Sequence, residues 1–187
     1  MQKHTMFSIP LFEAEYLEDL NPFIENCKAL SSRPGVNKSN NHGYQSTDDL
    51  HMCDFMEPLN RWICSNSGEA FDALGCPKES VLIESCWFNI NKDMNSHNQM
   101  HLHSGILSGV IYLQAPEGSG NINFMNLGMN QMWPGHLQSL WRNEHNAFHF
   151  TVKPEPGKMY LFPSYLYHSV DSNHKDVERI SISFNLR

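Results

Sequence analysis

Two closely spaced histidines, His101 and His103, are followed far along the chain by His168 and then by Arg179. Side chains alternate between the two faces of a strand, so imidazoles separated by one residue in a strand point to the same side. A third imidazole from a distant strand could complete a metal site, because neutral imidazole is a common ligand for Fe, Zn, Cu and Ni. Three protein ligands leave positions open for a substrate or for oxygen, and a nearby guanidinium could hold a carboxylate. This spacing therefore indicates metal-dependent chemistry as well as packing.

Short strand-like runs surround these residues and would position them. The runs are rich in β-branched or aromatic residues and are bounded by Gly, Pro, Asn or Ser, which is typical of strands. No long helical segment separates them, and this favours an antiparallel barrel or sandwich. The predicted strands are 81–90, 106–114, 121–126, 148–153, 158–163, 166–170 and 179–186.

The first part of the chain has a different pattern. Residues 11–30 carry apolar side chains at steps of three and four, which favours an amphipathic helix interrupted near Pro22. Residues 31–49 are rich in Ser, Asn and Gly and are expected to form a loop, and helical spacing returns over residues 48–74. We expect the two helices to cover one face of the sheet.

The chain has 187 residues, which is enough to bury one sizeable core. We expect a single domain over 1–187, with a helical N-terminal extension over 1–80 and a β-rich core over 81–187. Within the core, residues 126–147 are too long for a hairpin and resemble a lid or insertion over a site. The two tryptophans of this insertion either are buried or line a substrate mouth.

Composition restricts the partners and the compartment. The net charge is −7 with His neutral, and no cluster of Lys and Arg is long enough to neutralise a run of phosphates, so we expect no nucleic-acid partner. The five cysteines are scattered without a C-x-x-C pair, which favours reduced thiols over a disulfide framework or a zinc knuckle. The N-terminus lacks the apolar core of a signal peptide, and no apolar run approaches the roughly 20 residues of a membrane span. These features predict a cytoplasmic protein with no membrane partner.

Several segments, taken in order, resemble the motifs of one protein family. They resemble the 2-oxoglutarate- and Fe(II)-dependent oxygenase family that is typical of marine bacteria and their phages. The match is dense from about residue 81 to 187 and thin before that. The segments are Trp87-x-Asn89-Ile90, Asn98-Gln99-x-His101-x-His103, Leu107-Ser108-Gly109-Val110-Ile111-Tyr112-Leu113, Phe162-Pro163-Ser164-x-Leu166-x-His168-x-Val170, Arg179-Ile180-Ser181-Ile182-Ser183-Phe184-Asn185 and, more weakly, His42-Gly43-Tyr44-Gln45-Ser46.

The resemblance implies a mainly β, double-stranded β-helix (jelly-roll, cupin-like) fold with N-terminal helices packed on one face. It implies an enzyme that uses Fe(II) and 2-oxoglutarate to hydroxylate a small-molecule or peptide substrate, with release of succinate and CO2. The guanidinium of Arg179 suits the distal carboxylate of 2-oxoglutarate because its fork can bind a carboxylate bidentately. The residues with implied roles are His101, His103 and His168 as catalytic metal ligands, and Arg179, Ser181 and Tyr112 as contacts of 2-oxoglutarate.

The sequence departs from the wider superfamily at His103, where an aspartate or glutamate is the usual second ligand. Three neutral imidazoles leave the iron dipositive, and a 2-oxoglutarate dianion would neutralise it. A carboxylate from Asp93, Glu144 or Asp171 is an alternative ligand. A further alternative aligns His103-Ser104-Gly105 with the H-x-G motif of iron halogenases, at the cost of a shift against the following strand.

Other interpretations stay open at this point. Tyr112 either reaches the cosubstrate carboxylate or fills the barrel as an aromatic side chain. The whole chain could instead be a cupin-like three-histidine dioxygenase or isomerase that does not use 2-oxoglutarate, or a non-catalytic jelly-roll binding module. The exposed edges of such a barrel are compatible with a homodimer. Gly118-x-Gly120 is predicted to be a turn, because no helix follows it as a nucleotide-binding motif would require.

Overall fold

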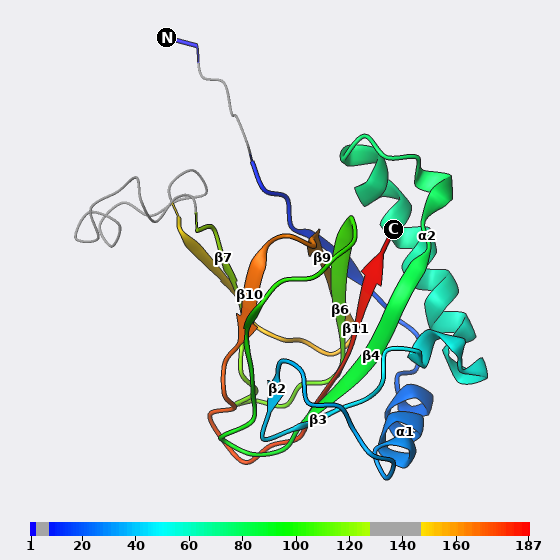
Figure 1. Ribbon diagram of the computed structural model, residues 1–187, viewed down its shortest axis with the longest axis vertical. Helices are drawn as coiled ribbons and strands as arrows, with labels where there is room; N and C mark the ends of the chain where they lie inside the picture. The colour runs from blue at the N-terminus through cyan, green and yellow to red at the C-terminus, as the bar shows by residue number, and fades with distance from the viewer. Residues whose placement is uncertain (3–7, 128–146) are drawn as a thin grey trace.

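The computed structural model describes residues 1–2, 8–127 and 147–187. It consists of two antiparallel sheets with two helices against one of them (Figure 1). The strands of the described part are β1 (Phe12–Glu15), β2 (Asn40–Asn41), β3 (Tyr44–Gln45), β4 (Ile83–Asn91), β5 (His97–His101), β6 (Leu107–Gln114), β7 (Ile122–Met125), β8 (His149–Val152), β9 (Lys158–Pro163), β10 (Tyr167–Val170) and β11 (Arg179–Leu186). The helices are α1 (Asn21–Leu30) and α2 (Glu57–Ala73), with 3-10 turns at Leu50–Met52, Asp54–Met56 and Lys78–Ser80.

The two sheets divide the strands between a major and a minor layer. Among the described residues, the major sheet has six strands in the order β1-β9-β6-β11-β4-β3, and the minor sheet has five in the order β2-β5-β10-β7-β8. Strands distant in sequence alternate between the layers, as in a double-stranded β-helix. The predicted fold class is therefore confirmed.

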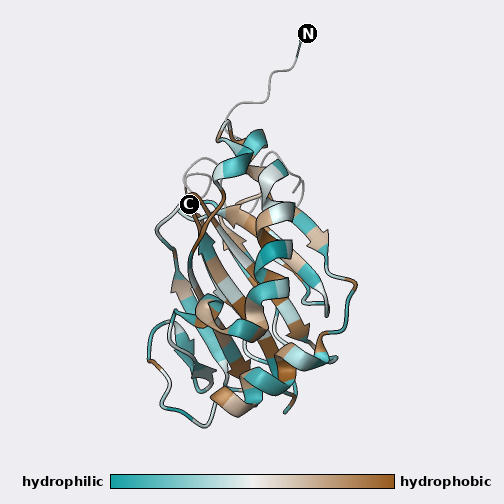
Figure 2. Ribbon diagram, turned by 90° about the vertical axis from the view of Figure 1, so that its right-hand side faces the viewer, coloured by the Kyte–Doolittle hydropathy of each residue, from teal (hydrophilic) through white to brown (hydrophobic). Residues whose placement is uncertain are grey.

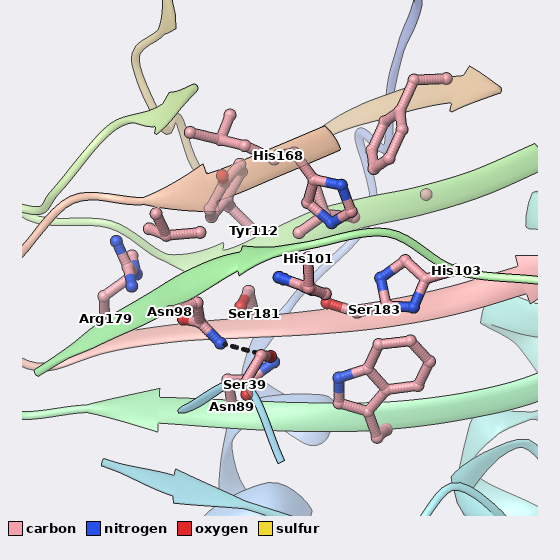
Figure 3. A pocket seen from close by; sticks show the side chains of 16 residues that line it. Ser39, Asn89, Asn98, His101, His103, Tyr112, His168, Arg179, Ser181 and Ser183 are labelled. Carbon is pink, nitrogen blue, oxygen red and sulfur yellow. Dashed lines mark hydrogen bonds between the residues drawn. The ribbon is translucent and has the colours of Figure 1, made fainter. Parts of the chain in front are cut away.

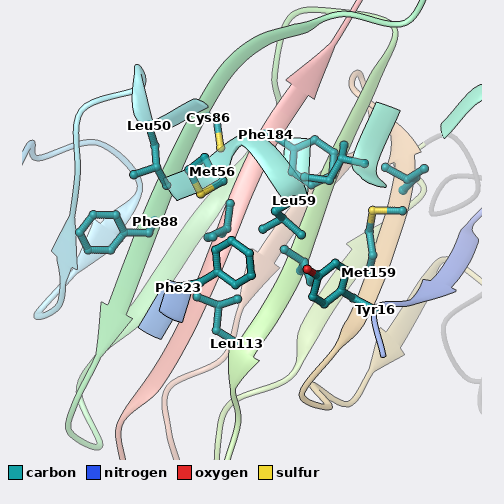
Figure 4. Close-up of a cluster of buried hydrophobic side chains, with 14 of the residues drawn as sticks. Tyr16, Phe23, Leu50, Met56, Leu59, Cys86, Phe88, Leu113, Met159 and Phe184 are labelled. Carbon is teal, nitrogen blue, oxygen red and sulfur yellow. The ribbon is translucent and has the colours of Figure 1, made fainter. Parts of the chain in front are cut away.

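The outer face of the major sheet forms the main hydrophobic core with the helices. Figure 2 shows both helices lying across this face, and Figure 4 shows the apolar side chains between them. On β11 the side chains of Ile180, Ile182 and Phe184 are fully buried there, in the same cluster as Leu59 and Ile63 of α2. Burial of this apolar surface holds the helices on the sheet.

The inner face of the same sheet is more polar and looks toward the minor sheet. Successive side chains of a strand point to opposite faces, so Arg179, Ser181 and Ser183 of β11 face inward and line a pocket. A second apolar cluster, which includes Tyr112, Phe124 and Phe162, fills part of the space between the layers. The strands thus separate the helix-covered core from the polar pocket.

Each predicted strand is present in the structure with nearly the expected bounds. The prediction for 158–163 coincides with β9, and that for 179–186 coincides with β11. The predicted turn between β6 and β7 is also confirmed, since Gly118 has a positive φ of 99° and Ser119 N donates to Pro116 O. Strands β9 and β11 gave the clearest apolar runs because almost all of their residues, on both faces, are buried.

The prediction of a helix over residues 11–20 is wrong. Residues 12–15 form β1, which pairs antiparallel with β9 from Phe12↔Leu161 to Glu15↔Lys158. The segment alternates between partly buried and exposed side chains, a period-two pattern that also satisfies a helical apolar spacing over so few residues. Pro22 lies in the first turn of α1, which begins at Asn21, and does not interrupt a longer helix; proline fits there because its missing N–H is not needed in the first turn.

The second predicted helix begins later than expected. Two 3-10 turns occupy residues 50–56, and the regular helix α2 starts at Glu57. Cys53 between the turns has an extended backbone (φ −79°, ψ 135°), which breaks the helical path. Pro58 then lies in the first turn of α2, where its missing N–H is not needed.

The N-terminal part of the chain also contributes strands to both sheets, beyond the helical extension that was expected. Inside the predicted loop 31–49, β2 pairs with β5 and β3 pairs with β4. Strand β5 was itself not predicted, because its sequence HNQMH has no β-branched residue and no Phe, Tyr or Trp.

Two further expectations concern the insertion after β7 and membrane-spanning helices. Most of the expected insertion 126–147, including Trp133 and Trp141, lies outside the described residues. Within the part of the chain that the structure describes, no helix is both long and apolar enough to cross a membrane.

Packing against the major sheet predicts opposite effects for two glycine substitutions. A Cβ at Gly109 of β6 would overlap the Phe184 ring and come within 2.7 Å of Leu161, whereas a Cβ at Gly68 of α2 would meet Lys78 at an ordinary 3.5 Å. We expect Gly109→Ala to lower the free energy of unfolding by about 1–3 kcal/mol through overpacking. We expect Gly68→Ala to raise it by about 0.5–1 kcal/mol, since alanine costs less backbone entropy in a helix. Denaturant unfolding of both variants measures these free energies. If Gly109→Ala unfolds with the same free energy as the parent protein, β6 is not packed as closely against Phe184 and Leu161 as described.

Candidate metal centre

Three histidines meet at one end of the inner pocket, as the sequence predicted. His101 and His168 are direct cross-strand partners on β5 and β10, which places their side chains on the same face. The ring centroids of His101 and His168 lie 4.2 Å apart, and that of His103 lies 4.8 and 5.0 Å from them. One nitrogen from each ring can be chosen so that all three lie within 4.8 Å of one another. Figure 3 shows His101, His103 and His168 close together at one end of the pocket.

Local hydrogen bonds orient two of the rings. Nδ1 of His101 lies 2.6 Å from Gln99 O, and Nδ1 of His168 lies 3.0 Å from Leu166 O. A carbonyl oxygen can only accept, so each Nδ1 carries the proton and each Nε2 keeps a free lone pair. His97 makes the same bond with Asn95 O at 2.8 Å without joining the cluster, so this bond alone does not mark a ligand.

His103 is held in a different way. It lies just beyond β5, and its backbone N donates to Ser164 O at 2.9 Å. Its ring has no hydrogen bond to any described residue, but it packs against Trp87 with ring centroids 5.3 Å apart. The backbone and an aromatic contact therefore position this imidazole.

The three imidazoles are neutral at physiological pH. Burial lowers the pKa of His101 below its ordinary value. Burial, together with the neighbouring His101, lowers the pKa of His103 to about 4 and that of His168 to about 3. Neutral imidazole is the form that binds a metal.

No carboxylate joins this cluster among the residues that the structure describes. Asp93 accepts from the backbone N of Asn95 at 2.8 Å, and Asp171 accepts from Asn123 Nδ2 at 2.7 Å, so both carboxylates are engaged elsewhere. Glu144 lies outside the described residues. The alternative H-x-G register would leave His101 out, yet His101 is a member of the cluster and its ring lies 4.2 Å from that of His168.

Arg179 lies at the other end of the pocket and is only 2% exposed. Its Nη1 donates to Gly120 O at 2.7 Å, and it forms no ion pair with a described carboxylate. Gly120 N in turn donates to Asn173 Oδ1 at 3.2 Å, and a Cβ at Gly120 would overlap Asp171 O. Burial lowers the pKa of Arg179, which reflects the cost of an unpaired buried charge. This guanidinium is therefore available to an anionic ligand.

Tyr112 and Ser181 lie between the two ends. They are cross-strand partners on β6 and β11, and both line the pocket. The Tyr112 hydroxyl is buried without a hydrogen-bond partner among the described residues, and burial raises its pKa to about 12. An unsatisfied buried hydroxyl is costly, so a ligand that accepts a hydrogen bond from it would be favoured.

These donors fit a metal ion together with a carboxylate ligand. Neutral imidazole nitrogens suit Fe(II), and the unpaired guanidinium and orphaned hydroxyl suit a carboxylate. Residues 85–185, more than half of the chain, match the family described as "Putative 2OG-Fe(II) oxygenase". The chain belongs to this family. The cofactors of this oxygenase are accordingly Fe(II) and 2-oxoglutarate.

Solved structures share the fold of the oxygenase at low sequence identity. The α-ketoglutarate-dependent epimerase SnoN from nogalamycin biosynthesis matches with a TM-score of 0.68 and 13% identity over 95% of this chain and 78% of that chain. A Pseudomonas putida prolyl-4-hydroxylase matches with a TM-score of 0.65 and 12% identity over 95% and 91%. HygX from Streptomyces hygroscopicus, solved with nickel and 2-oxoglutarate, matches with a TM-score of 0.58 and 11% identity over 95% and 82%. A search of curated proteins gives no significant sequence match.

The pocket of the oxygenase also contains residues to which the sequence assigned no role. Trp87, Asn89 and Asn98 line it, and all three belong to the motifs that carry the family resemblance. Ser39 lines it too, from the segment expected to be a loop. Nothing in the local sequence distinguishes Ser39 from the other polar residues around it.

The cluster predicts that two histidine substitutions will affect Fe(II) affinity very differently. One is at His97, on β5, and the other is at His103, just after β5. His103→Ala removes one member of the cluster, whereas His97→Ala removes only the local Asn95 bond. We expect His103→Ala to weaken Fe(II) binding by more than the roughly 10- to 100-fold typical of a lost outer-shell partner, and His97→Ala to leave it unchanged. Anaerobic metal titration measures both affinities. Equal binding by the two variants would exclude His103 from the metal site.

Proposed function

We propose that this protein is an oxygenase in which His101, His103 and His168 hold Fe(II) and Arg179 binds the distal carboxylate of 2-oxoglutarate. The proposed reaction hydroxylates a C–H bond of a small-molecule or peptide substrate, with release of succinate and CO2. The observation that carries the proposal is the pairing, in one pocket, of a three-imidazole cluster with a buried guanidinium that has no anionic partner among the described residues.

Each part of the pocket has a distinct task in this proposal. Bound Fe(II) and 2-oxoglutarate would supply the oxidising chemistry: one atom of O2 would enter the substrate and the other would enter succinate, while the oxidative decarboxylation of 2-oxoglutarate would provide two electrons. The protein orients them, since the imidazoles are fixed by β5, β10 and Trp87. Three neutral ligands leave the metal charge to be balanced by the cosubstrate dianion.

Buried hydrogen-bond donors lie at the Arg179 end of the pocket, where the proposal places the distal carboxylate of 2-oxoglutarate. Arg179 is held by Gly120 O, which leaves its remaining N–H groups for a carboxylate. Ser181 shares its strand face, and the Tyr112 hydroxyl is free to donate. We assign all three to 2-oxoglutarate.

The reaction outcome and the substrate go beyond the family assignment. The matched structures include an epimerase, a carbocyclase and a prolyl-4-hydroxylase, so one fold hosts several outcomes. Among the described residues that line the pocket, the ionisable ones are the three histidines, the weakly acidic Tyr112 and Arg179. This favours a substrate that is uncharged near the reacting carbon. A cytoplasmic location, a homodimer, a phage or marine bacterial source and the lack of nucleic-acid or membrane partners stay predictions.

The proposed function predicts an optical signal and a product. Anaerobic addition of Fe(II) and 2-oxoglutarate to the metal-free protein should give a visible metal-to-ligand charge-transfer band, and admission of oxygen should then yield succinate. Metal binding without band or succinate would sink the proposal and favour a three-histidine enzyme that does not use 2-oxoglutarate. Absence of any metal binding would favour a non-catalytic binding module.

The orphaned hydroxyl of Tyr112 predicts a separation between stability and cosubstrate affinity. Tyr112→Phe removes a buried donor that has no described partner, so the free energy of unfolding should stay the same or rise slightly. A hydrogen bond to a charged group contributes about 1.5–3 kcal/mol, so the affinity for 2-oxoglutarate should fall roughly 10- to 100-fold. Tyr160→Phe is the matched control, because Tyr160 lies on the neighbouring strand β9 outside the pocket lining. If Tyr112→Phe binds 2-oxoglutarate as tightly as the parent protein, Tyr112 only fills the barrel.

A further inference from the structure

A row of three side chains crosses the floor of the pocket between Arg179 and the histidines. Ser181 of β11 pairs with Tyr112 of β6 on one side and with Asn89 of β4 on the other. Directly paired residues of an antiparallel sheet point to the same face, and all three line the pocket. In Figure 3 Tyr112 and Asn89 lie on opposite sides of Ser181. Asn89 is thus the counterpart of Tyr112 across the path between the two ends of the pocket.

The orientation of the Asn89 amide is fixed from behind by Asn40. Asn40 Nδ2 lies 3.3 Å from Tyr44 O, and because a carbonyl oxygen can only accept, the Asn40 atom on this side must be its nitrogen. The same nitrogen donates to Asn89 Oδ1 at 3.0 Å. The oxygen of the Asn89 amide therefore faces Asn40, and its NH2 group is left without a partner among the described residues.

The segment that supplies Asn40 is built closely around this contact. Asn40 is 5% exposed, and a Cβ at Gly43 would overlap its Oδ1 and come within 2.8 Å of Ile90 O. The pairing of Gln45 with Asn89 holds β3 beside β4. Residues 40–45 lie outside the part of the chain that matches the family, yet they determine which atom of Asn89 faces the pocket.

The ligand that suits this arrangement is an anion. The Asn89 NH2 group can only donate, and among the described residues the Tyr112 hydroxyl has no partner and the Arg179 guanidinium has no carboxylate partner. No Asp or Glu lines the described pocket, so a bound carboxylate would meet donors on all of these sides.

We infer that Asn89 Nδ2 is a hydrogen-bond donor to 2-oxoglutarate and that Asn40 is the positioning residue that fixes this donor. The inference rests on the proposed function, in that 2-oxoglutarate occupies the pocket between the histidines and Arg179. It adds a residue of β4 and the N-terminal segment around Asn40 to the cosubstrate site.

Asn89→Asp tests the donor with almost no change of shape. The Asn40 bond is kept, because an aspartate oxygen also accepts, while the pocket-facing NH2 becomes a carboxylate oxygen that repels the dianion. We expect the affinity for 2-oxoglutarate, titrated anaerobically through the charge-transfer band with Fe(II) present, to fall roughly 100-fold, and Fe(II) affinity without 2-oxoglutarate to stay within about 2-fold. Asn66→Asp, the same change on the exposed surface of α2, should alter neither value.

Two further variants separate positioning from folding. Asn89→Ala, which removes the donor without adding charge, should weaken 2-oxoglutarate binding roughly 10-fold. Asn40→Ala releases the Asn89 amide and should weaken it several-fold, again without loss of Fe(II) affinity. Arg179→Ala provides the reference for loss of cosubstrate binding. If Asn89→Asp does not fold, the Fe(II) and 2-oxoglutarate affinities of Asn89→Ala test the role of Asn89 in its place.

The outcomes distinguish this inference from the proposed function. Absence of a 2-oxoglutarate-dependent band in the parent protein overturns both. A normal band in the parent, with unchanged 2-oxoglutarate affinity in Asn89→Asp and Asn89→Ala, overturns the role of Asn89 alone. Equal losses of Fe(II) and 2-oxoglutarate affinity in these variants show a structural role and also overturn it.

Discussion

The strict alternation of side chains along β11 is the constraint on which the rest of the structure depends. This strand lies between β6 and β4 in the major sheet, and its even-numbered apolar residues Ile180, Ile182 and Phe184 are buried beneath the helices. The odd-numbered residues, starting with Arg179, are thereby directed to the inner face. A slip of one residue would bury the guanidinium among aliphatic side chains, so the burial that stabilises the fold also fixes the register of the pocket.

The two ends of the pocket come from different sheets. His101 and His168 are a cross-strand pair of the minor sheet, whereas Arg179 belongs to the major sheet. Neither sheet alone carries both the histidine cluster and the guanidinium that could donate to a carboxylate. In the proposed complex, the cosubstrate spans the space between the layers and contacts residues of both sheets.

The sequence predicts those parts of the structure in which burial leaves a periodic pattern. Strands β9 and β11 are found with the expected bounds because their apolar residues are continuous or alternate. The three histidines and Arg179 are brought to one pocket because each lies on or beside such a strand. The short β1 was taken for a helix, since four residues do not separate a period of two from one of 3.6, and polar β5 carries no strand signal of its own.

The contribution of Asn40 illustrates why the remaining part of the site is hidden from the sequence. Its neighbourhood is polar and has the composition of a loop, and its role arises only because β2 pairs with β5 and β3 pairs with β4, which together place Asn40 behind Asn89. Such tertiary hydrogen bonds leave no periodic pattern. The pocket also has an electrostatic consequence for the proposed complex, because the three clustered imidazoles are neutral and no Asp or Glu lines the described pocket. In the proposed complex, a dipositive metal and the Arg179 guanidinium share one anion, the cosubstrate, and each favours its binding. Thermodynamic linkage makes this effect reciprocal, so 2-oxoglutarate must strengthen metal binding in the same proportion as the metal strengthens the binding of 2-oxoglutarate.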